Sequence, residues 1–207
     1  MDREFRIGLA LSLLTLLRPA ESSAEFRVGL CDTTGVELST LQAAREEASV
    51  LFETAVVSLR WEADCDVPPR TTPHSARIYV VPRIPEGIAN RYRQYRDKTN
   101  VMGYVLANER ENRAGVIYVA RGAVEGNASR SGRTALTEAQ LARALGRVFA
   151  HELAHRFLAS GHTKRGILKE SLSQEELIDG DGEALFFTPD QMRILHQRVE
   201  RSAGGVF

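Results

Sequence analysis

The sequence predicts a mixed α/β (α+β) domain, in which a crossover helix, a long helix and a C-terminal helix pack on a mixed five-stranded sheet. Short apolar and β-branched runs are typical of strands, and they alternate with segments whose apolar residues recur at helical spacing. The order of strand, helix, several strands and two further helices indicates a sheet with one crossover connection. The predicted strands are residues 26–30, 56–61, 76–81, 101–107 and 116–120.

The N-terminal segment has the pattern of a secretory signal peptide. Two arginines precede an apolar run at residues 7–17, and small residues follow at 22–24. The run is shorter than the roughly 20 residues that a membrane-spanning helix requires. We therefore expect residues 1–24 to be removed after Ala24, leaving one domain at residues 25–207 without a membrane span. A buried amphipathic helix is the alternative.

The composition excludes several classes of protein. Of the 207 residues, 43% are hydrophobic and 26% are charged, which is the balance of a globular chain. The 27 basic and 27 acidic residues cancel, so the chain lacks the positive charge that attracts nucleic acid. Two cysteines are too few for a four-thiolate zinc site. Any metal site must therefore use His, Asp or Glu, and nucleic acid is not an expected partner.

The first helix is predicted at residues 40–55. Ser39 and Gln42 have the spacing of a capping box, and the apolar residues that follow recur at helical spacing. Cys31 and Cys65 each follow one of the strands on either side of this helix. If these strands are parallel, their carboxyl ends lie on the same side of the sheet. In an oxidising compartment we expect a disulfide between the two cysteines, with two buried free thiols as the alternative.

Turn and capping residues set the bounds of the later elements. Residues 108–114 are predicted to connect a hairpin, and residues 122–133, which are rich in Gly, Ser and Asn, to form a surface loop. Thr137 with Gln140 repeats the capping box and begins the long helix, which Gly161 is expected to end.

The last helix begins at Thr188, Pro189 and Gln191. Its Met192, Leu195 and Val199 recur at helical spacing, and we expect this face to pack on the core. No internal repeat or second domain is apparent in the sequence.

The chemistry of the chain is concentrated in the long helix, where residues 151–155 read His-Glu-Leu-Ala-His. Two histidines four positions apart lie on one face of a helix, so both rings can reach one zinc ion. Glu152 is offset from that face and can act on a water that the zinc activates, as a general base. Peptide hydrolysis is the reaction that suits this arrangement best. The alternative is that the two histidines only contact neighbours within the fold.

A third zinc ligand has to come from outside this helical turn. His162 is the best candidate, because it follows Gly161, which can adopt a left-handed conformation and reverse the chain beneath the metal. A surface role for His162 is the alternative. His74 and His196 are isolated in the sequence, and we expect them to be structural. The rival ligands are the carboxylates of Glu170, Glu175, Glu176 and Glu183.

The segment from His151 to His162 resembles the extended zinc motif of the metzincin metallopeptidases. Three positions depart from that motif: His162 comes one residue late, Leu158 replaces a glycine, and Leu168 stands where a turn methionine is expected. A narrower resemblance is to small exported bacterial proteins classed as zinc peptidases. It rests on residues 150–155, Gly161, His162, 166–168 and 187–191.

The resemblance covers most of the mature chain and implies a zincin-like domain that holds Zn²⁺ through His151, His155 and His162. It implies that the strand at residues 101–107 is the exposed edge of the sheet and pairs with an extended peptide substrate. Gly103 in this strand leaves room for a close approach of backbone, with a bulge or a bend as the alternative. Leu168 is expected to supply an apolar floor beneath the metal.

Two functions from different classes remain. The first is a secreted zinc metallopeptidase with Glu152 as general base. The second is a catalytically inactive exported protein with a zincin-like fold that binds zinc or peptides. Structural zinc sites are usually closed by four protein ligands, so the ligand count separates the two. An enzyme that acts on a cell-wall peptide or another small amide is a third interpretation.

Overall fold

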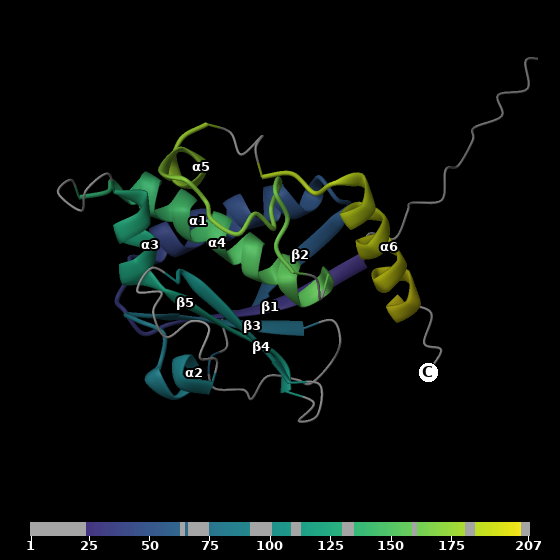
Figure 1. Cartoon of the computed structure of the whole chain (residues 1–207), viewed down its shortest axis with the longest axis horizontal. Coiled ribbons are helices and arrows are strands. Elements are labelled where there is room, and N and C mark those ends of the chain that lie inside the picture. Colours follow the sequence, from purple (N-terminus) through teal and green to yellow (C-terminus); the bar gives the residue numbers. More distant parts are fainter. Residues whose placement is uncertain are drawn as a thin grey trace, which may run out of the picture.

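The computed structural model describes residues 24–62, 65, 75–91, 101–108, 113–129, 135–158, 161–180 and 185–203. Five strands form one sheet in the order β2-β1-β3-β5-β4, as Figure 1 shows. All neighbouring strands are parallel except β4 and β5, which pair as an antiparallel hairpin. The predicted mixed five-stranded sheet is confirmed, with β4 at one edge. The strands are β1 (Ala24–Asp32), β2 (Val57–Glu62), β3 (Ser75–Val81), β4 (Gly103–Asn108) and β5 (Arg113–Ala120).

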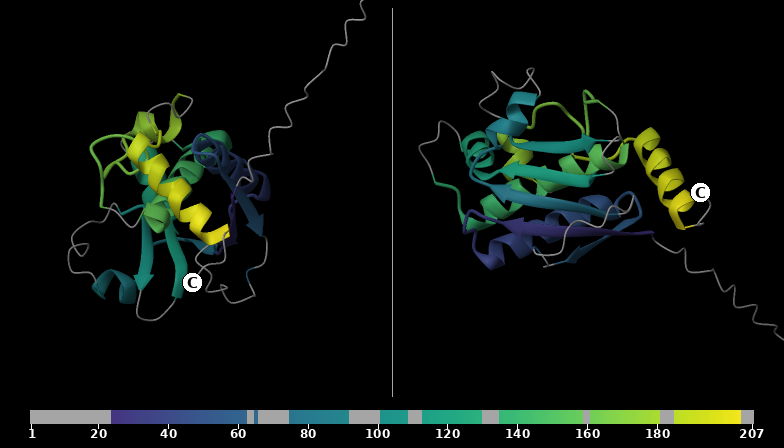
Figure 2. Two further views of the ribbon diagram at one scale, coloured as in Figure 1. Left: turned by 90° about the vertical axis from the view of Figure 1, so that its right-hand side faces the viewer. Right: turned by 90° about the horizontal axis from the view of Figure 1, so that it is seen from below.

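The helices divide between the two faces of the sheet. In Figures 1 and 2, α1, α3 and α4 lie over one face, whereas α2 lies on the other. Helix α6 packs across one end of the sheet. The helices are α1 (Leu38–Glu53), α2 (Glu86–Arg91), α3 (Arg121–Ala128), α4 (Glu138–Leu158), α5 (Gln174–Ile178) and α6 (Pro189–Ala203). Among the described residues, no helix combines the length and the apolar character needed to cross a membrane.

Helix α1 is the predicted crossover between the parallel strands β1 and β2. The prediction that Ser39 caps it is wrong, because the helix already begins at Leu38 and its N-cap, Glu37, makes no side-chain capping bond. The turn before the helix is instead held by Asp32, whose carboxylate accepts hydrogen bonds from the backbone N–H groups of Thr34 and Val36 at 2.9 and 2.8 Å. A short acidic side chain thus organises the approach to α1.

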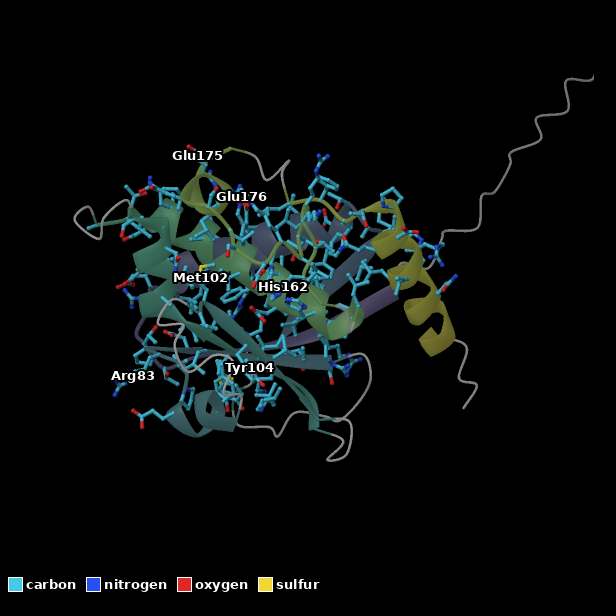
Figure 3. The ribbon with its side chains drawn as sticks, viewed as in Figure 1. Arg83, Met102, Tyr104, His162, Glu175 and Glu176 are labelled. Atoms are coloured by element: carbon cyan, nitrogen blue, oxygen red, sulfur yellow. A yellow bond between two sulfur atoms is a disulfide. The ribbon has the colours of Figure 1, made fainter. Side chains whose placement is uncertain are left out.

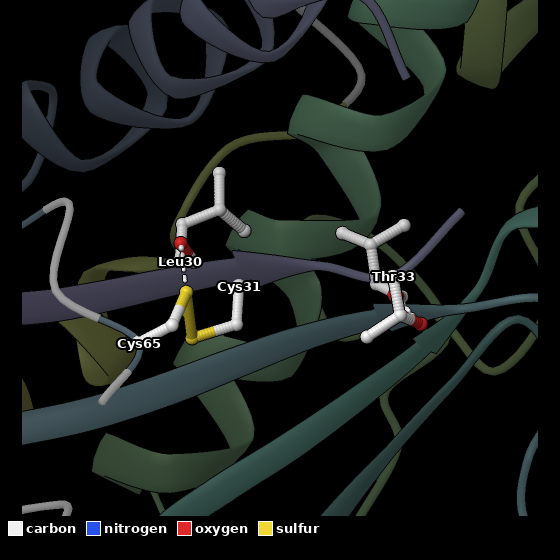
Figure 4. Close-up of a disulfide and its surroundings, with 5 residues drawn as sticks. Leu30, Cys31, Thr33 and Cys65 are labelled. Atoms are coloured by element: carbon white, nitrogen blue, oxygen red, sulfur yellow. Dashed lines mark hydrogen bonds between the residues drawn. A yellow bond between two sulfur atoms is a disulfide. The ribbon is translucent and has the colours of Figure 1, made fainter. Parts of the chain in front are cut away.

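Cys31 and Cys65 form a disulfide in the structure, as Figure 4 shows. Cys31 lies in β1, whose parallel neighbour β2 ends at Glu62, three residues before Cys65. The two Cα atoms are 5.4 Å apart, which is within the usual span of a disulfide. The bridge therefore ties the segment after β2 back to the central part of the sheet.

Opening this disulfide is expected to destabilise the protein substantially. The bridge joins residues 34 positions apart, and on the chain-entropy model a loop of this size contributes about 3 to 4 kcal/mol. We expect the double variant Cys31→Ser/Cys65→Ser to unfold at a lower urea concentration than the oxidised protein. Adding a reductant should lower the urea midpoint of the wild type but should leave that of the variant unchanged. Equal midpoints for oxidised wild type and variant would contradict the prediction.

Helix α4 is buried along most of its length because it packs against α1 and against the sheet. Its predicted capping box is present: the Thr137 backbone N–H donates to the Gln140 side chain at 3.0 Å, and the Gln140 N–H donates to the Thr137 hydroxyl at 3.2 Å. At Gly146, an added Cβ would come 2.5 Å from the backbone carbonyl oxygen of Ala44. The α1 and α4 main chains therefore pass each other in direct contact.

The prediction of a surface loop at residues 122–133 is wrong for its first part, which forms helix α3. Val124 and Ala128 are fully buried one turn apart, so packing outweighs the low helix propensity of the glycines in this segment. The Arg121 and Glu125 side chains pair at 2.8 Å along the same helix. Helices α2 and α5 were not predicted either.

The C-terminal helix α6 has the expected start. The Thr188 backbone N–H donates to the Gln191 side chain at 2.8 Å, and the Gln191 N–H donates to the Thr188 hydroxyl at 3.3 Å. Leu195 is fully buried, and Met192 packs partly buried against the core. His196 donates to the Ala55 carbonyl at 2.8 Å, which gives this histidine a structural role.

Candidate metal centre

Three histidines meet where α4 ends. His151 and His155 lie on one face of α4, and His162 lies on the segment that follows the helix. Their candidate ligand nitrogens all lie within 4.8 Å of one another. The Nε2 atoms of His151 and His155 are 3.0 Å apart. The structure therefore brings together the three histidines that the sequence singled out.

The donor set fits zinc. Two nitrogens bound at 2.0–2.1 Å to a tetrahedral zinc ion lie about 3.3 Å apart, close to the separation of the His151 and His155 nitrogens. His151 is buried, His155 is partly buried and His162 is exposed. Within the described chain this group consists of three histidines, the number of protein ligands typical of a catalytic zinc site.

The orientation of His151 is fixed by a backbone carbonyl. Its Nδ1 lies 2.7 Å from the Ile167 carbonyl oxygen, so Nδ1 carries the proton and donates it, leaving Nε2 free to bind a metal. Burial, together with a smaller electrostatic contribution from the neighbouring His155, lowers the pKa of His151 to about 3. The ring is therefore neutral at neutral pH, which is the form that binds metal.

A tight turn at residues 163–169 holds the Ile167 carbonyl in place. The Thr163 N–H donates to the Leu168 carbonyl at 2.7 Å, and the Ile167 N–H donates to the Phe186 carbonyl at 3.0 Å. Gly166 has a φ of +79°, and a Cβ on it would collide with the Phe186 carbonyl oxygen. Leu168, the expected apolar floor, is fully buried in the core. The backbone of this turn thus determines how the His151 ring is oriented.

Replacing Gly166 with alanine is expected to weaken zinc binding 10- to 100-fold, the usual effect of losing a hydrogen-bond partner of a metal ligand. The added methyl group would displace the turn and with it the Ile167 carbonyl. Gly35→Ala is the matched control, because Gly35 also has a positive φ, +72°, but an added Cβ there meets nothing within 4 Å. Competition with a chromophoric chelator measures both affinities. Equal losses in the two variants would show that the Phe186 contact is irrelevant.

Glu152 lies beside the histidines and is almost completely buried, with 6% of its surface exposed. Its Oε1 is 4.0 Å from the Nε2 of His151. Burial raises the pKa of the Glu152 carboxyl to about 8. Such a shift is typical of carboxyl groups that exchange protons near neutral pH.

The rival carboxylate ligands are not part of the histidine group among the described residues. Glu176 is engaged elsewhere, because both of its oxygens accept hydrogen bonds from Lys169 at 2.7 Å and it completes a capping box with Ser173. Figure 3 shows Glu175 on α5, apart from His162. Glu170 is exposed, and Glu183 lies outside the described residues.

The expected role of Gly161 is wrong. Helix α4 ends at Leu158, and Gly161 is absent from the glycines with a positive φ among the described residues. The left-handed glycine of this region is Gly166, within the turn that holds His151. His74, the other isolated histidine, lies outside the described residues.

Sequence reasoning missed two arginines that connect α4 to the segment after the histidines. Arg147 is one turn before His151 and is 1% exposed. It donates to the backbone carbonyls of Glu176, Asp179 and Gly180 at 2.8–2.9 Å and pairs with Glu47 at 2.7 Å. Arg143, one turn earlier, donates to the Ile178 carbonyl at 2.6 Å. The available signal was the spacing of 143, 147 and 151, which places all three side chains on one helix face.

The edge strand β4 lies against Glu152. A Cβ on Gly103 would overlap Glu152, coming 2.5 Å from both its Cγ and its Cδ. The residue that lies against Gly103 is therefore a side chain of α4, and the irregularity of β4 lies further along, between Leu106 and Asn108. Tyr104, the next residue, lies on the side of the sheet away from His162 in Figure 3.

Comparison with known proteins supports the fold. No family model matches the sequence, and no curated protein matches it. Among solved structures, a zinc-dependent peptidase from Methanocorpusculum labreanum is similar at a TM-score of 0.52 and 16% identity, over 81% of this chain and 99% of that chain. Archaemetzincin from Methanopyrus kandleri is similar at a TM-score of 0.50 and 10% identity, over 88% of this chain and 99% of that chain. The chain has a metzincin-like fold.

Proposed function

We propose that the protein is an exported zinc-dependent peptidase, in which His151, His155 and His162 hold the metal and Glu152 is the general base. The observation that carries the proposal is the convergence of three imidazoles within 4.8 Å, with the buried Glu152 carboxylate 4.0 Å from one of them. The fold shared with two zinc peptidase structures supports it.

Zinc, when bound, would supply a Lewis acid that polarises the scissile carbonyl and makes water more acidic. Glu152 takes up the proton of the attacking water and can deliver it to the departing amine. His151 contributes orientation, since the Ile167 carbonyl holds its ring in one tautomer. His162 is exposed, which leaves this side of the group accessible to a substrate.

The proposed substrate is an extended peptide that pairs with β4. This strand is at the edge of the sheet, so one side of its backbone is paired with β5 and the other can accept a further strand. Because Gly103 of β4 contacts Glu152, a peptide added along this strand would lie next to the general base.

Metal analysis and peptide cleavage test the proposal together. We expect the purified full chain to bind about one zinc ion and to cleave members of a peptide library, with activity lost on chelation and restored by zinc. A zinc site closed by a fourth protein ligand, with no cleavage, would favour the inactive binding protein instead. Failure to bind zinc would reject the peptidase and would leave an inactive protein that binds peptides.

Export forms a separate part of the proposal. Cleavage after Ala24 would remove only the first residue of β1, so the sheet would remain intact. Expressed in a bacterial host with its own N-terminus, the protein is expected outside the cytoplasm with Glu25 as its first residue. N-terminal sequencing of the exported product checks the position. A cytoplasmic product that retains the first 24 residues would contradict export.

A further inference from the structure

We propose that Gly103 is a positioning residue for Glu152, and that the missing side chain at this point of the edge strand sets where the general base stands. This inference rests on the proposed function. The observation behind it is the overlap described above: a Cβ at Gly103 would meet the Cγ and Cδ of Glu152 at 2.5 Å and would also strike Oε1.

The added Cβ would meet the Cγ of Glu152 and not only the carboxylate at the end of its side chain. A Cβ that struck a flexible end could be accommodated by a small rotation. Here Cγ is as close as Cδ, so the side chain would have to leave its rotamer. The backbone of α4 cannot move easily to relieve the overlap, because Glu152 lies in the buried part of this helix.

Strand β4 is equally fixed at this point. Gly103 pairs with Val119 of β5, and the Ala120 N–H donates to the Met102 carbonyl at 2.8 Å. Val119, Ala120 and the neighbouring Ile117 are buried, so β5 belongs to the core of the sheet. Moving β4 away from α4 would break these hydrogen bonds. A side chain at position 103 therefore displaces the Glu152 carboxylate in preference to the strand.

The geometry gives Gly103 two effects on the site. It lets the backbone of β4 cover one flank of the carboxylate, which contributes to the burial of Glu152. It also sets the distance between the general base and the strand that would pair with substrate. Burial and placement of the base thus depend on a residue that itself carries no reactive group.

The variant Gly103→Ala tests this, with Gly126→Ala as the matched control. Gly126 is exposed in α3, and an added Cβ there meets nothing within 4 Å. We expect Gly103→Ala to lower kcat about 100-fold, the loss typical of a misplaced catalytic group. Its zinc affinity should stay within about threefold of the wild type, because no imidazole is touched. Gly126→Ala should change neither value.

A double-mutant cycle separates positioning from a general structural role. Glu152→Ala removes the Cγ, the Cδ and both oxygens, which include every atom that the added Cβ would meet. In that background, Gly103→Ala should change the residual kcat by less than about threefold, because the group that it displaces is absent. If the loss is as large as in the wild-type background, or if kcat and zinc affinity fall in parallel, Gly103 has only a structural role and the proposal is wrong.

A crystal structure of Gly103→Ala loaded with zinc decides the question without reference to activity. We expect the Glu152 carboxylate to be displaced while β4 remains paired with β5. An unmoved carboxylate would overturn the proposal. If the wild type binds zinc but cleaves no peptide, the proposed function fails, and this structure still tests the placement of Glu152 by Gly103.

Discussion

Replacing Glu152 with glutamine is expected to lower kcat by a factor of about 10² to 10⁴, the range attributed to general acid–base catalysis. The amide matches the carboxylate in size, so it fits against Gly103 without a new clash. It cannot accept a proton from the attacking water. Because the three imidazoles are untouched, the variant should still bind zinc with an affinity close to that of the wild type.

Glu175→Gln is the matched control for this experiment. Glu175 is exposed on α5, and its substitution makes the same change of charge away from the histidine group. Its kcat should equal that of the wild type. Steady-state kinetics with a cleaved library peptide and metal analysis of each variant give the comparison. Cleavage by Glu152→Gln at the wild-type rate would remove Glu152 from the mechanism, and loss of zinc from Glu175→Gln would reopen the question of the third ligand.

Replacing Arg147 with methionine is expected to destabilise the protein by about 3 to 5 kcal/mol, the usual cost of removing one partner of a buried ion pair. The guanidinium is 1% exposed and serves four acceptors at once. Methionine fills similar space but leaves the Glu47 carboxylate and three backbone carbonyls without their donor. This loss is a large part of the 5–15 kcal/mol that typically stabilises a domain.

Urea unfolding measures the effect, with two further variants for comparison. Arg147→Lys keeps the charge but cannot reach several carbonyls at once, so its stability should fall between those of the wild type and Arg147→Met. Arg60→Met removes an exposed arginine that pairs with Glu25 at 3.3 Å, and it should cost less than about 1 kcal/mol. A loss for Arg147→Met no larger than for Arg60→Met would show that the buried network contributes little.

The part of the site that the sequence predicts is the part set by helical spacing. His151 and His155 are four residues apart in a segment whose start is marked by Thr137 and Gln140, so their shared face follows from the geometry of one helix. His162 is close enough along the chain to be found by inspection. These residues could be predicted from the sequence because their proximity depends on local structure.

The contacts that orient the site could not be predicted from the sequence, because they join distant parts of the chain through backbone atoms. The Ile167 carbonyl that fixes His151 is a group that every residue carries, so no residue type marks it. The overlap of Gly103 with Glu152 depends on which strand forms the edge beside α4. Arg147 could be placed on a helix face, but its acceptors belong to a segment 29–33 residues away.

The errors in the fold arise where tertiary packing or a competing local interaction outweighs a motif. Gly122 and Gly126 indicate a loop, yet the burial of Val124 and Ala128 makes the segment a helix. Ser39 and Gln42 match a capping box, but Asp32 already organises the turn before α1. In both segments the residue types were interpreted correctly one by one, and the interactions with the rest of the chain decided the structure.

The close passage of α1 and α4 at Gly146 restricts how the protein can move. At this point α4 lies directly against the Ala44 carbonyl and the Glu47 side chain of α1, so the two helices have little room to slide past each other. Contact with α1 therefore restricts the movement of the helix that carries His151, Glu152 and His155. Entry of a substrate and release of a product are therefore not expected to involve a movement of α4 against α1.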